Sequence, residues 1–258
     1  MIHAFARWRR DRILRRHLVS LATFERAVER LPILRGLAPD ELQRLRESAS
    51  LLLYDKSFSA AGGAEVDDAM QLAIALQASL LTLNLAEESY RGWNEIILYP
   101  DEFLHNREEM DEAGVVHHSR DILAGESWHG GPLVLSLADV VASGQADGFN
   151  VVLHEFAHKL DMLNGDANGF PPLHRGMDAA AWADNFSRAY DDFCARVDAS
   201  EDTAIDPYAS HDPAEFFAVL TEAFFETPSL LHAEYPAVYR QLQLFYRQHP
   251  LQRLGDTA

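Results

Sequence analysis

The order of apolar and polar positions along the chain predicts a protein that is mostly helical. Residues 1–60 read as helical pieces, and apolar residues at helical spacing continue through much of the remaining chain. Between capping residues, prolines and glycines, this spacing predicts helices over residues 39–53, 66–88, 148–165, 179–197, 212–227 and 237–249. Short continuous apolar runs predict strands at residues 95–99, 114–118 and 132–137. We therefore expect an α+β fold, mainly helical, with a small sheet from the middle of the chain.

The change from helices to strands near residue 90 indicates two regions. We expect residues 1–90 to form an N-terminal helical region that packs on a core of residues 91–258, the two making one compact unit.

The helix predicted over residues 148–165 has three signals that agree with one another. Asn150 can cap its start, and Gly165 suits the position just past its end. The apolar residues between them follow one helical stripe, made of Phe149, Val152, Leu153, Phe156, Leu160 and Leu163.

The same helix carries the pattern H-E-x-x-H, formed by His154, Glu155 and His158. At about 100° per residue, the two histidines lie within about 40° of each other, one turn apart. Two imidazoles placed in this way can bind one Zn²⁺, with Glu155 beside the water that the metal activates. The pattern also occurs by chance on helices, but the agreement of cap, stop and stripe favours a metal site.

Composition and charge narrow the function classes. The chain has 258 residues, of which 48% are hydrophobic and 24% charged, as in an ordinary soluble globular protein. A formal net charge of −18 argues against nucleic-acid binding, because phosphate contacts need clustered Lys and Arg. The single cysteine, Cys194, excludes an intrachain disulfide and favours the reducing cytoplasm.

Two segments bear on membrane association. The uncharged run at residues 69–86 is barely long enough to span a bilayer, and Gln71, Gln77 and Asn84 would be costly there. We expect a helix buried in the core instead, and no membrane insertion. The basic segment at residues 3–19 lacks the apolar stretch of a signal peptide, and we interpret it as a basic amphipathic helix or a partly frayed arm.

A catalytic zinc site needs a third protein ligand. The extended pattern H-E-x-x-H-x-x-G-x-x-H is not continued, because Asp161 and Asn164 occupy its next positions. His174 lies in a proline-rich loop with no helical register to place it. Glu215 and Glu222 lie seven residues apart on one predicted helix and share a face, although Glu215 is also where a capping box places a glutamate. On these physical grounds the two glutamates are equal candidates.

Five blocks of the sequence resemble the Mlc titration factor A family of zinc-dependent peptidases. They span roughly Trp93 to Leu254 and read GWNEIILYP, GPLVLS, HEFAHKLD, YASHDPAEFFAVLTEAFF and FYRQHPLQRL. The resemblance is loose over the N-terminal third. The family is similar to the gluzincin metallopeptidases, notably the catalytic domain of anthrax lethal factor, which implies a zincin-like metallopeptidase core.

The resemblance also implies the roles of individual residues. It makes Glu215 the third zinc ligand beside His154 and His158, with one Zn²⁺ per chain and Glu155 as the general base. It further implies a tyrosine seven residues before the third ligand. Tyr208 occupies that position and would donate a hydrogen bond to the oxyanion of the reaction.

The activity implied by the resemblance is zinc-dependent hydrolysis of peptide bonds, aminopeptidase-like and directed at small peptides. A second function of a different class is a regulatory protein that sequesters an Mlc-like transcriptional repressor of sugar uptake. The expected partners are therefore a peptide substrate and an Mlc-like repressor, without direct contact with nucleic acid. The expected location is cytoplasmic.

Several other residues have weaker functional interpretations. Asp161 either orients an imidazole or is a solvated acid at the helix end, and the two are equally good. His211 and Glu222 could also support a metal ligand. The strand at residues 132–137 either borders a cleft and pairs with substrate or lies inside the sheet. The pair His117–His118 is interpreted as a strand end rather than a second metal site.

Overall fold

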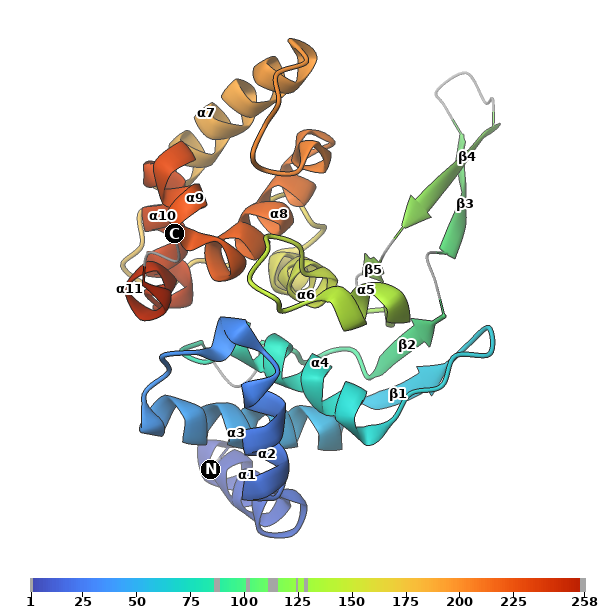
Figure 1. Ribbon diagram of the computed structural model, residues 1–258, viewed down its shortest axis with the longest axis vertical. Helices are drawn as coiled ribbons and strands as arrows, with labels where there is room; N and C mark the ends of the chain where they lie inside the picture. The colour runs from blue at the N-terminus through green and yellow to red at the C-terminus, as the bar shows by residue number, and fades with distance from the viewer. Residues whose placement is uncertain are drawn as a thin grey trace.

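The structure is a computed structural model of the chain, and it describes residues 2–85, 89–100, 103–110, 116–123, 125–127 and 130–255. Helices dominate the described residues, and a small sheet lies on one side of them (Figure 1). This arrangement confirms the predicted α+β, mainly helical class.

The first part of the chain forms a group of helices. They are α1 (Ile2–His17), α2 (Leu21–Glu29), α3 (Pro39–Asp55) and α4 (Asp68–Leu81), with the single turn η1 (Pro32–Leu34). α3 begins at a proline, whose fixed φ suits the first turn of a helix. α4 ends several residues before the predicted end at residue 88. The side-chain amide of Gln248 donates to the carbonyl of Leu80 at 2.7 Å, so another part of the chain takes up a carbonyl at the helix end.

Four strands form one sheet in the order β1-β2-β6-β5. Their bounds are β1 (Ser57–Ala60), β2 (Glu95–Tyr99), β5 (Gly125–Ser127) and β6 (Leu133–Ser136). β1 and β6 are both parallel to β2, and β5 is antiparallel to β6. The strands predicted at residues 95–99 and 132–137 are confirmed, whereas β1 and β5 were missed because neither contains a continuous apolar run.

A second, two-stranded sheet projects from the body of the molecule (Figure 1). It consists of β3 (Phe103–Met110) and the antiparallel β4 (Val116–Leu123). The strand predicted at residues 114–118 lies partly outside the described residues, and its last three residues open β4.

β6 lies inside the sheet, hydrogen-bonded to β2 on one side and to β5 on the other. Its backbone groups are therefore already paired on both sides. The interpretation of residues 132–137 as a cleft-edge strand is wrong, and the interior interpretation is correct.

Two buried lysines tie the sheet to the rest of the molecule through Trp93. Lys56 donates to the carbonyls of Tyr90 and Trp93 at 2.5 Å each, and its Nζ lies 3.7 Å from the centroid of the Trp93 ring. Lys159 lies 5.1 Å from the same ring and donates to the carbonyl of Gly131 at 3.0 Å. Because Lys159 belongs to the helix with the H-E-x-x-H pattern, these contacts fix that helix against the start of β6.

The remaining chain is helical. Its elements are α5 (Leu137–Ala142), α6 (Val151–Asp161), η2 (Met162–Asn164), α7 (Ala179–Asp198), η3 (Pro207–Ser210), α8 (Pro213–Glu226), α9 (Pro228–Glu234), α10 (Pro236–Tyr246) and α11 (Pro250–Leu254). α6 lies in the middle of the molecule, between α4 and α8, with α7 and α9 to α11 beyond α8 (Figure 1). Within the described residues, no helix combines the length and the apolar character needed to cross a membrane.

The predicted apolar stripe of residues 148–165 is buried only over α6 itself. Val152, Leu153 and Phe156 are fully buried, whereas Phe149 and Leu163 are 39% and 44% exposed. The difference arises because the helix is shorter than predicted: it starts after Asn150 and ends at Asp161.

Asp161 joins the end of α6 to the start of α8 through the loop that follows. Its side chain is fully buried, and one carboxylate oxygen accepts from the backbone amides of Asn168 and Gly169 at 2.7 Å each. Gly169 has φ of +76°, and a Cβ there would lie 2.4 Å from the carbonyl oxygen of Pro213. Asp161 is therefore not a solvated acid: it is buried and holds a loop that packs on the first residue of α8. Its charge also acts on His158, so the role of orienting an imidazole stays a prediction.

Replacing Asp161 by alanine should destabilise the fold by about 2–4 kcal/mol, because the buried amide of Gly169 and the partly buried amide of Asn168 lose their acceptor. Urea denaturation measures this difference. The matched control is Asp166→Ala, which removes an exposed carboxylate from the same loop and should leave the midpoint nearly unchanged. Equal midpoints for the two variants would contradict the role given to Asp161.

Candidate metal centre

Local sequence sets where α6 begins and which face its histidines occupy. The side chain of Asn150 accepts from the amide of Leu153 at 2.9 Å, so the predicted cap is confirmed. His154 and His158 follow one turn apart, with ring centroids 4.8 Å apart and the rings edge to face. Glu155, between them, is 4% exposed.

α8 brings a carboxylate to the two histidines. Asp212 caps this helix by accepting from the amides of Ala214 and Glu215 at 2.8 and 2.9 Å, and Pro213 occupies its first position. The Glu215 carboxylate turns away from the cap and toward α6, so it meets the imidazoles.

Three donor atoms converge at this crossing of α6 and α8. Nε2 of His154 lies 2.9 Å from Oε2 of Glu215, Nε2 of His158 lies 3.3 Å from the same oxygen, and the two nitrogens are 3.1 Å apart. The side chains of these residues are between 9% and 17% exposed, so the atoms are close to solvent but not open to it.

Glu222 approaches His154 from the opposite side. Its Oε1 lies 2.7 Å from Nδ1 of His154, and its Oε2 accepts from the backbone amide of Asn150 at 2.5 Å. A carboxylate at Nδ1 requires the hydrogen of a neutral ring to sit there, which leaves the Nε2 lone pair directed at Glu215 and His158. The two glutamates that the sequence left as equal candidates therefore occupy opposite ends of one imidazole.

The pKa directions reflect this arrangement of charges. Burial opposes protonation of His154, but hydrogen bonds to Glu215 and Glu222 outweigh it and raise its pKa well above the ordinary value. Burial likewise opposes ionisation of Glu215, yet the two imidazoles outweigh it and lower the pKa of this carboxyl. For Glu222, burial outweighs its hydrogen bonds and the pKa is raised. The two carboxyl groups around His154 therefore favour a positive charge at the point where these side chains meet.

The donor set fits a zinc ion. Ligand atoms about 2.0–2.2 Å from a tetrahedral ion lie roughly 3.3–3.6 Å from one another. The observed separations of 2.9–3.3 Å form a triangle only slightly tighter than this. Two nitrogens and one carboxylate oxygen are also the atoms that zinc accepts from protein. Among the described residues, this trio is the only group of three such side chains close enough to hold a metal ion.

Tyr208 lies beside the trio. Its ring centroid is 6.2 Å from that of His154, and its side chain is 41% exposed. Burial of the hydroxyl and the negative charges of Glu215 and Glu155 raise its pKa above the ordinary value. The phenol therefore stays protonated and can donate a hydrogen bond.

Other predicted candidates lie outside this arrangement. Nε2 of His174 donates to the carbonyl of Phe245 at 2.7 Å, so this histidine serves packing. His211 stacks on Tyr208 at 5.9 Å between ring centroids and contacts Asp212, not a member of the trio. His117–His118 belongs to β4, in a segment whose side chains are outside the described residues.

A buried polar chain behind Glu222 was not predicted. The side-chain amide of Asn150 donates to Gln77 of α4 at 2.7 Å and to Glu226 of α8 at 2.5 Å. Gln77, Asn150 and Glu226 are all buried. The one signal in the sequence was Gln77, a polar residue inside an otherwise apolar helix; its partners lie more than 70 residues away along the chain and could not be identified.

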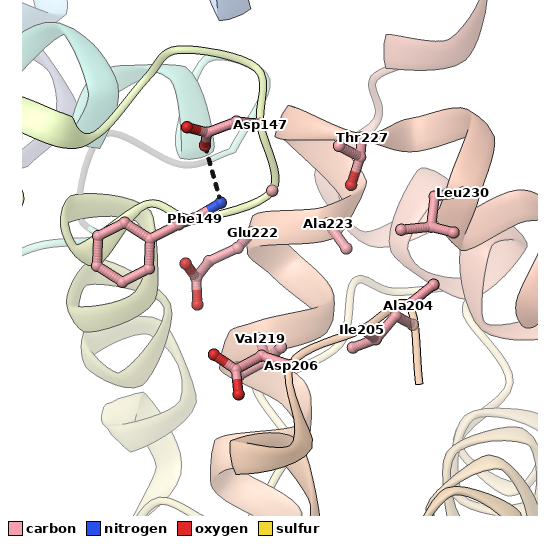
Figure 2. Close-up of a pocket in the computed structure, with 11 residues that line it drawn as sticks. Asp147, Phe149, Ala204, Ile205, Asp206, Val219, Glu222, Ala223, Thr227 and Leu230 are labelled. Atoms are coloured by element: carbon pink, nitrogen blue, oxygen red, sulfur yellow. Dashed lines mark hydrogen bonds between the residues drawn. The ribbon is translucent and has the colours of Figure 1, made fainter. Parts of the chain in front are cut away.

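A hollow of about 210 Å³ opens beside this polar chain (Figure 2). Glu222 points into it from α8, Phe149 stands at its side, and Asp147 and Asp206 contribute carboxylates. Because Glu222 bonds to Nδ1 of His154, while the trio meets at Nε2, the pair of Glu222 and His154 separates the hollow from the three converging atoms.

The fold and this site define a mainly helical α+β protein in which two crossing helices form a candidate His-His-Glu metal centre. Comparison with known families agrees with that class. A sequence profile of the glucose-regulated metallo-peptidase M90 family matches residues 5–247, so the chain belongs to this family.

Similarity to individual proteins agrees with the family. The chain is 40% identical over 227 residues to proteins called Mlc titration factor A from Yersinia enterocolitica and Yersinia pestis. The match covers 87% of this chain and 85% and 84% of the two relatives. The resemblance to the Mlc titration factor A family is therefore confirmed, and it extends through the N-terminal third, where the sequence blocks were weak.

Replacing Glu222 by alanine should weaken zinc binding about 10–100-fold, the usual effect of removing a carboxylate that orients a ligand histidine. Glu215→Ala should weaken it more, because a ligand atom is lost. Competition with a chelating dye measures both affinities, with the exposed Glu201→Ala as control. If Glu215→Ala retained zinc binding and Glu222→Ala lost it, Glu222 would be the ligand and Glu215 the carboxylate that orients His154.

Glu226 should make stability depend on pH. Burial outweighs its hydrogen bond from Asn150 and raises the pKa of Glu226 from 4.5 to about 7. Between these values the folded protein holds a proton that the unfolded chain has lost, so stability falls as pH rises from 4.5 to 7, by up to about 3 kcal/mol. Glu226→Gln stays neutral, so its stability should fall less over this range; the part of the fall that remains comes from His154 and Glu222, whose pKa values are also raised.

Urea denaturation of metal-free protein at about pH 5 and about pH 8, either side of the titration, tests the prediction. Glu65→Gln, an exposed change of the same kind, should keep the dependence of the unmodified protein. A change in stability between the two pH values that is equal in the unmodified protein and in Glu226→Gln would contradict it.

Proposed function

We propose that the protein is a zinc-dependent metallopeptidase in which His154, His158 and Glu215 hold one Zn²⁺. The observation that carries the proposal is the convergence of three acceptor atoms within 3.3 Å beside Glu155 of the H-E-x-x-H pattern. Membership of a metallo-peptidase family supports it. The arrangement of ligands is that of a gluzincin, and α6, α8 and the sheet correspond to a zincin-like core.

The chain's own residues would bind substrate, position the metal ligands and move a proton. When bound, zinc lowers the pKa of a coordinated water to about 7 and polarises the scissile carbonyl. The Glu155 carboxylate accepts a proton from the attacking water and delivers it to the nitrogen of the leaving amine. Glu222 keeps the hydrogen of His154 at Nδ1, so that Nε2 remains available as a ligand.

Tyr208 would act on the substrate oxygen. Its hydroxyl donates a hydrogen bond where negative charge develops as water adds to the carbonyl. The raised pKa supports this role, because the hydroxyl keeps its proton at neutral and moderately alkaline pH.

The proposed enzyme acts on peptides, in an aminopeptidase-like manner. We retain the division into a helical region at residues 1–90 and a catalytic core at residues 91–258 as part of the proposal. β1, from the first region, pairs with β2 of the second, so the two would share the sheet and act as one unit.

Glu155→Gln should keep zinc and fold but lose peptide hydrolysis by at least about 10²-fold, because the amide cannot accept the proton. A panel of aminoacyl and internally quenched peptides, assayed with and without chelator, measures the loss. Asp166→Asn removes an exposed carboxylate near the same helix and should keep full activity. Unchanged turnover by Glu155→Gln would refute the assignment of the general base.

Tyr208→Phe should lower kcat about 10²–10³-fold while zinc affinity is unchanged, because only the hydrogen bond to the developing oxyanion is removed. Tyr54→Phe changes another exposed tyrosine, 49% accessible, and serves as control. A fall in zinc affinity equal to the fall in kcat would show that Tyr208 supports the metal rather than the reaction.

A second function is favoured by the name of the relatives, Mlc titration factor A. We propose that the protein also binds an Mlc-like repressor and removes it from DNA, with peptide hydrolysis then secondary. Size-exclusion chromatography of the Glu155→Gln protein with the repressor of its own organism tests this without hydrolysis. A stable complex is expected, and separate elution at micromolar concentration would contradict it.

A further inference from the structure

The outward face of α1 carries exposed aromatic rings among arginines. Phe5 and Trp8 are 65% and 50% exposed, and their ring centroids are 5.8 Å apart. The Arg12 guanidinium lies 5.4 Å from the centroid of the Trp8 ring. At about 100° per residue, Trp8, Arg12 and Arg15 fall within roughly 60° of one another. These side chains therefore form one face.

A different side of α1 attaches the helix to α3 without using these groups. Ile13 is 5% exposed, Arg9 pairs with Asp55 at 2.6 Å, and Arg10 pairs with Glu47 at 2.5 Å. Packing therefore does not account for the aromatic pair on the other side. Contiguous exposed apolar side chains on a soluble protein commonly mark a binding surface.

Charge identifies the kind of partner. α1 contains six arginines and one aspartate, whereas the whole chain has a net charge of −18. α1 also lies at one end of the molecule, with α3 between it and the helices of the metal centre (Figure 1). The basic and aromatic residues of α1 therefore lie at one end of an otherwise acidic molecule. That end can approach a negatively charged surface.

We propose that the outward face of α1, formed by Phe5, Trp8, Arg12 and Arg15, docks on an anionic phospholipid bilayer. Arginines bind lipid phosphates, and Trp and Phe rings settle at the level of the headgroups. The helix lies on the surface and does not cross it. Duplex nucleic acid would bind the arginines but would leave Phe5 and Trp8 exposed to water. A bilayer binds both the arginines and the aromatic rings.

Co-sedimentation of the full-length protein with vesicles tests the proposal. Binding is expected to vesicles of phosphatidylcholine mixed with phosphatidylglycerol, to weaken as salt screens the charges, and to be absent with phosphatidylcholine alone. Arg12→Gln/Arg15→Gln should lower the partition coefficient about 30-fold, since each arginine near an anionic surface contributes roughly five-fold. The matched control, Arg175→Gln/Arg240→Gln, removes two exposed arginines from other elements and should bind as the unmodified protein does.

The contribution of Phe5 and Trp8 is tested with a second pair of variants. Phe5→Ser/Trp8→Ser should weaken vesicle binding, whereas Val141→Ser/Leu244→Ser, at positions 63% and 56% exposed, should not. Circular dichroism establishes that each variant is folded.

Three results would each overturn the proposal: no binding to anionic vesicles at low salt, equal loss in the α1 and control variants, or binding to duplex DNA in place of vesicles. The outcome is independent of the proposed peptidase activity, because none of these residues belongs to the metal centre.

Discussion

The candidate metal centre depends on one crossing, where His154 of α6 is held between Glu215 and Glu222 of α8. Both glutamates lie on the same face of α8, seven residues apart, and each meets a different nitrogen of the same imidazole, at 2.9 and 2.7 Å. The ring therefore has one tautomer when neutral and one orientation. His158 lies on the next turn of α6. Its Nε2, the Nε2 of His154 and Oε2 of Glu215 then converge on one point. Without the second glutamate, the imidazole would lose the contact that fixes its Nδ1, and the three converging atoms would be held less firmly.

Much of the surrounding structure serves to keep these two helices in register. Asn150 caps α6, supplies its backbone amide to Glu222 and links both to Gln77 of α4 and Glu226. At the other end, Asp161 holds the loop that packs on the start of α8. Lys159 attaches α6 to the start of β6. The site thus draws on the N-terminal helices, the sheet and the C-terminal helices together.

Local patterns in the sequence were sufficient to predict the mainly helical fold and the two histidines of the candidate site. Asn150, Asp212 and Pro213 act through neighbours within three residues, so the starts of α6 and α8 were predictable. Glu215 and Glu222 could not be separated in this way, because their difference depends on which side of His154 each reaches, a contact between residues more than 60 apart. β1 and β5 were missed for a related reason: their pairing comes from neighbouring strands rather than from apolar residues of their own. The contacts of Asp161 with the loop amides were missed because nothing near it in sequence revealed those amides.

The central claim is that His154, His158 and Glu215 coordinate zinc while Glu222 does not. Diffraction data from zinc-loaded crystals, collected at the zinc absorption edge, test it most directly. The account predicts one anomalous peak, about 2.0–2.2 Å from Nε2 of both histidines and from a Glu215 oxygen, with Glu222 still bonded to Nδ1 of His154. A peak bonded to Glu222, or one located away from the crossing of α6 and α8, would contradict it.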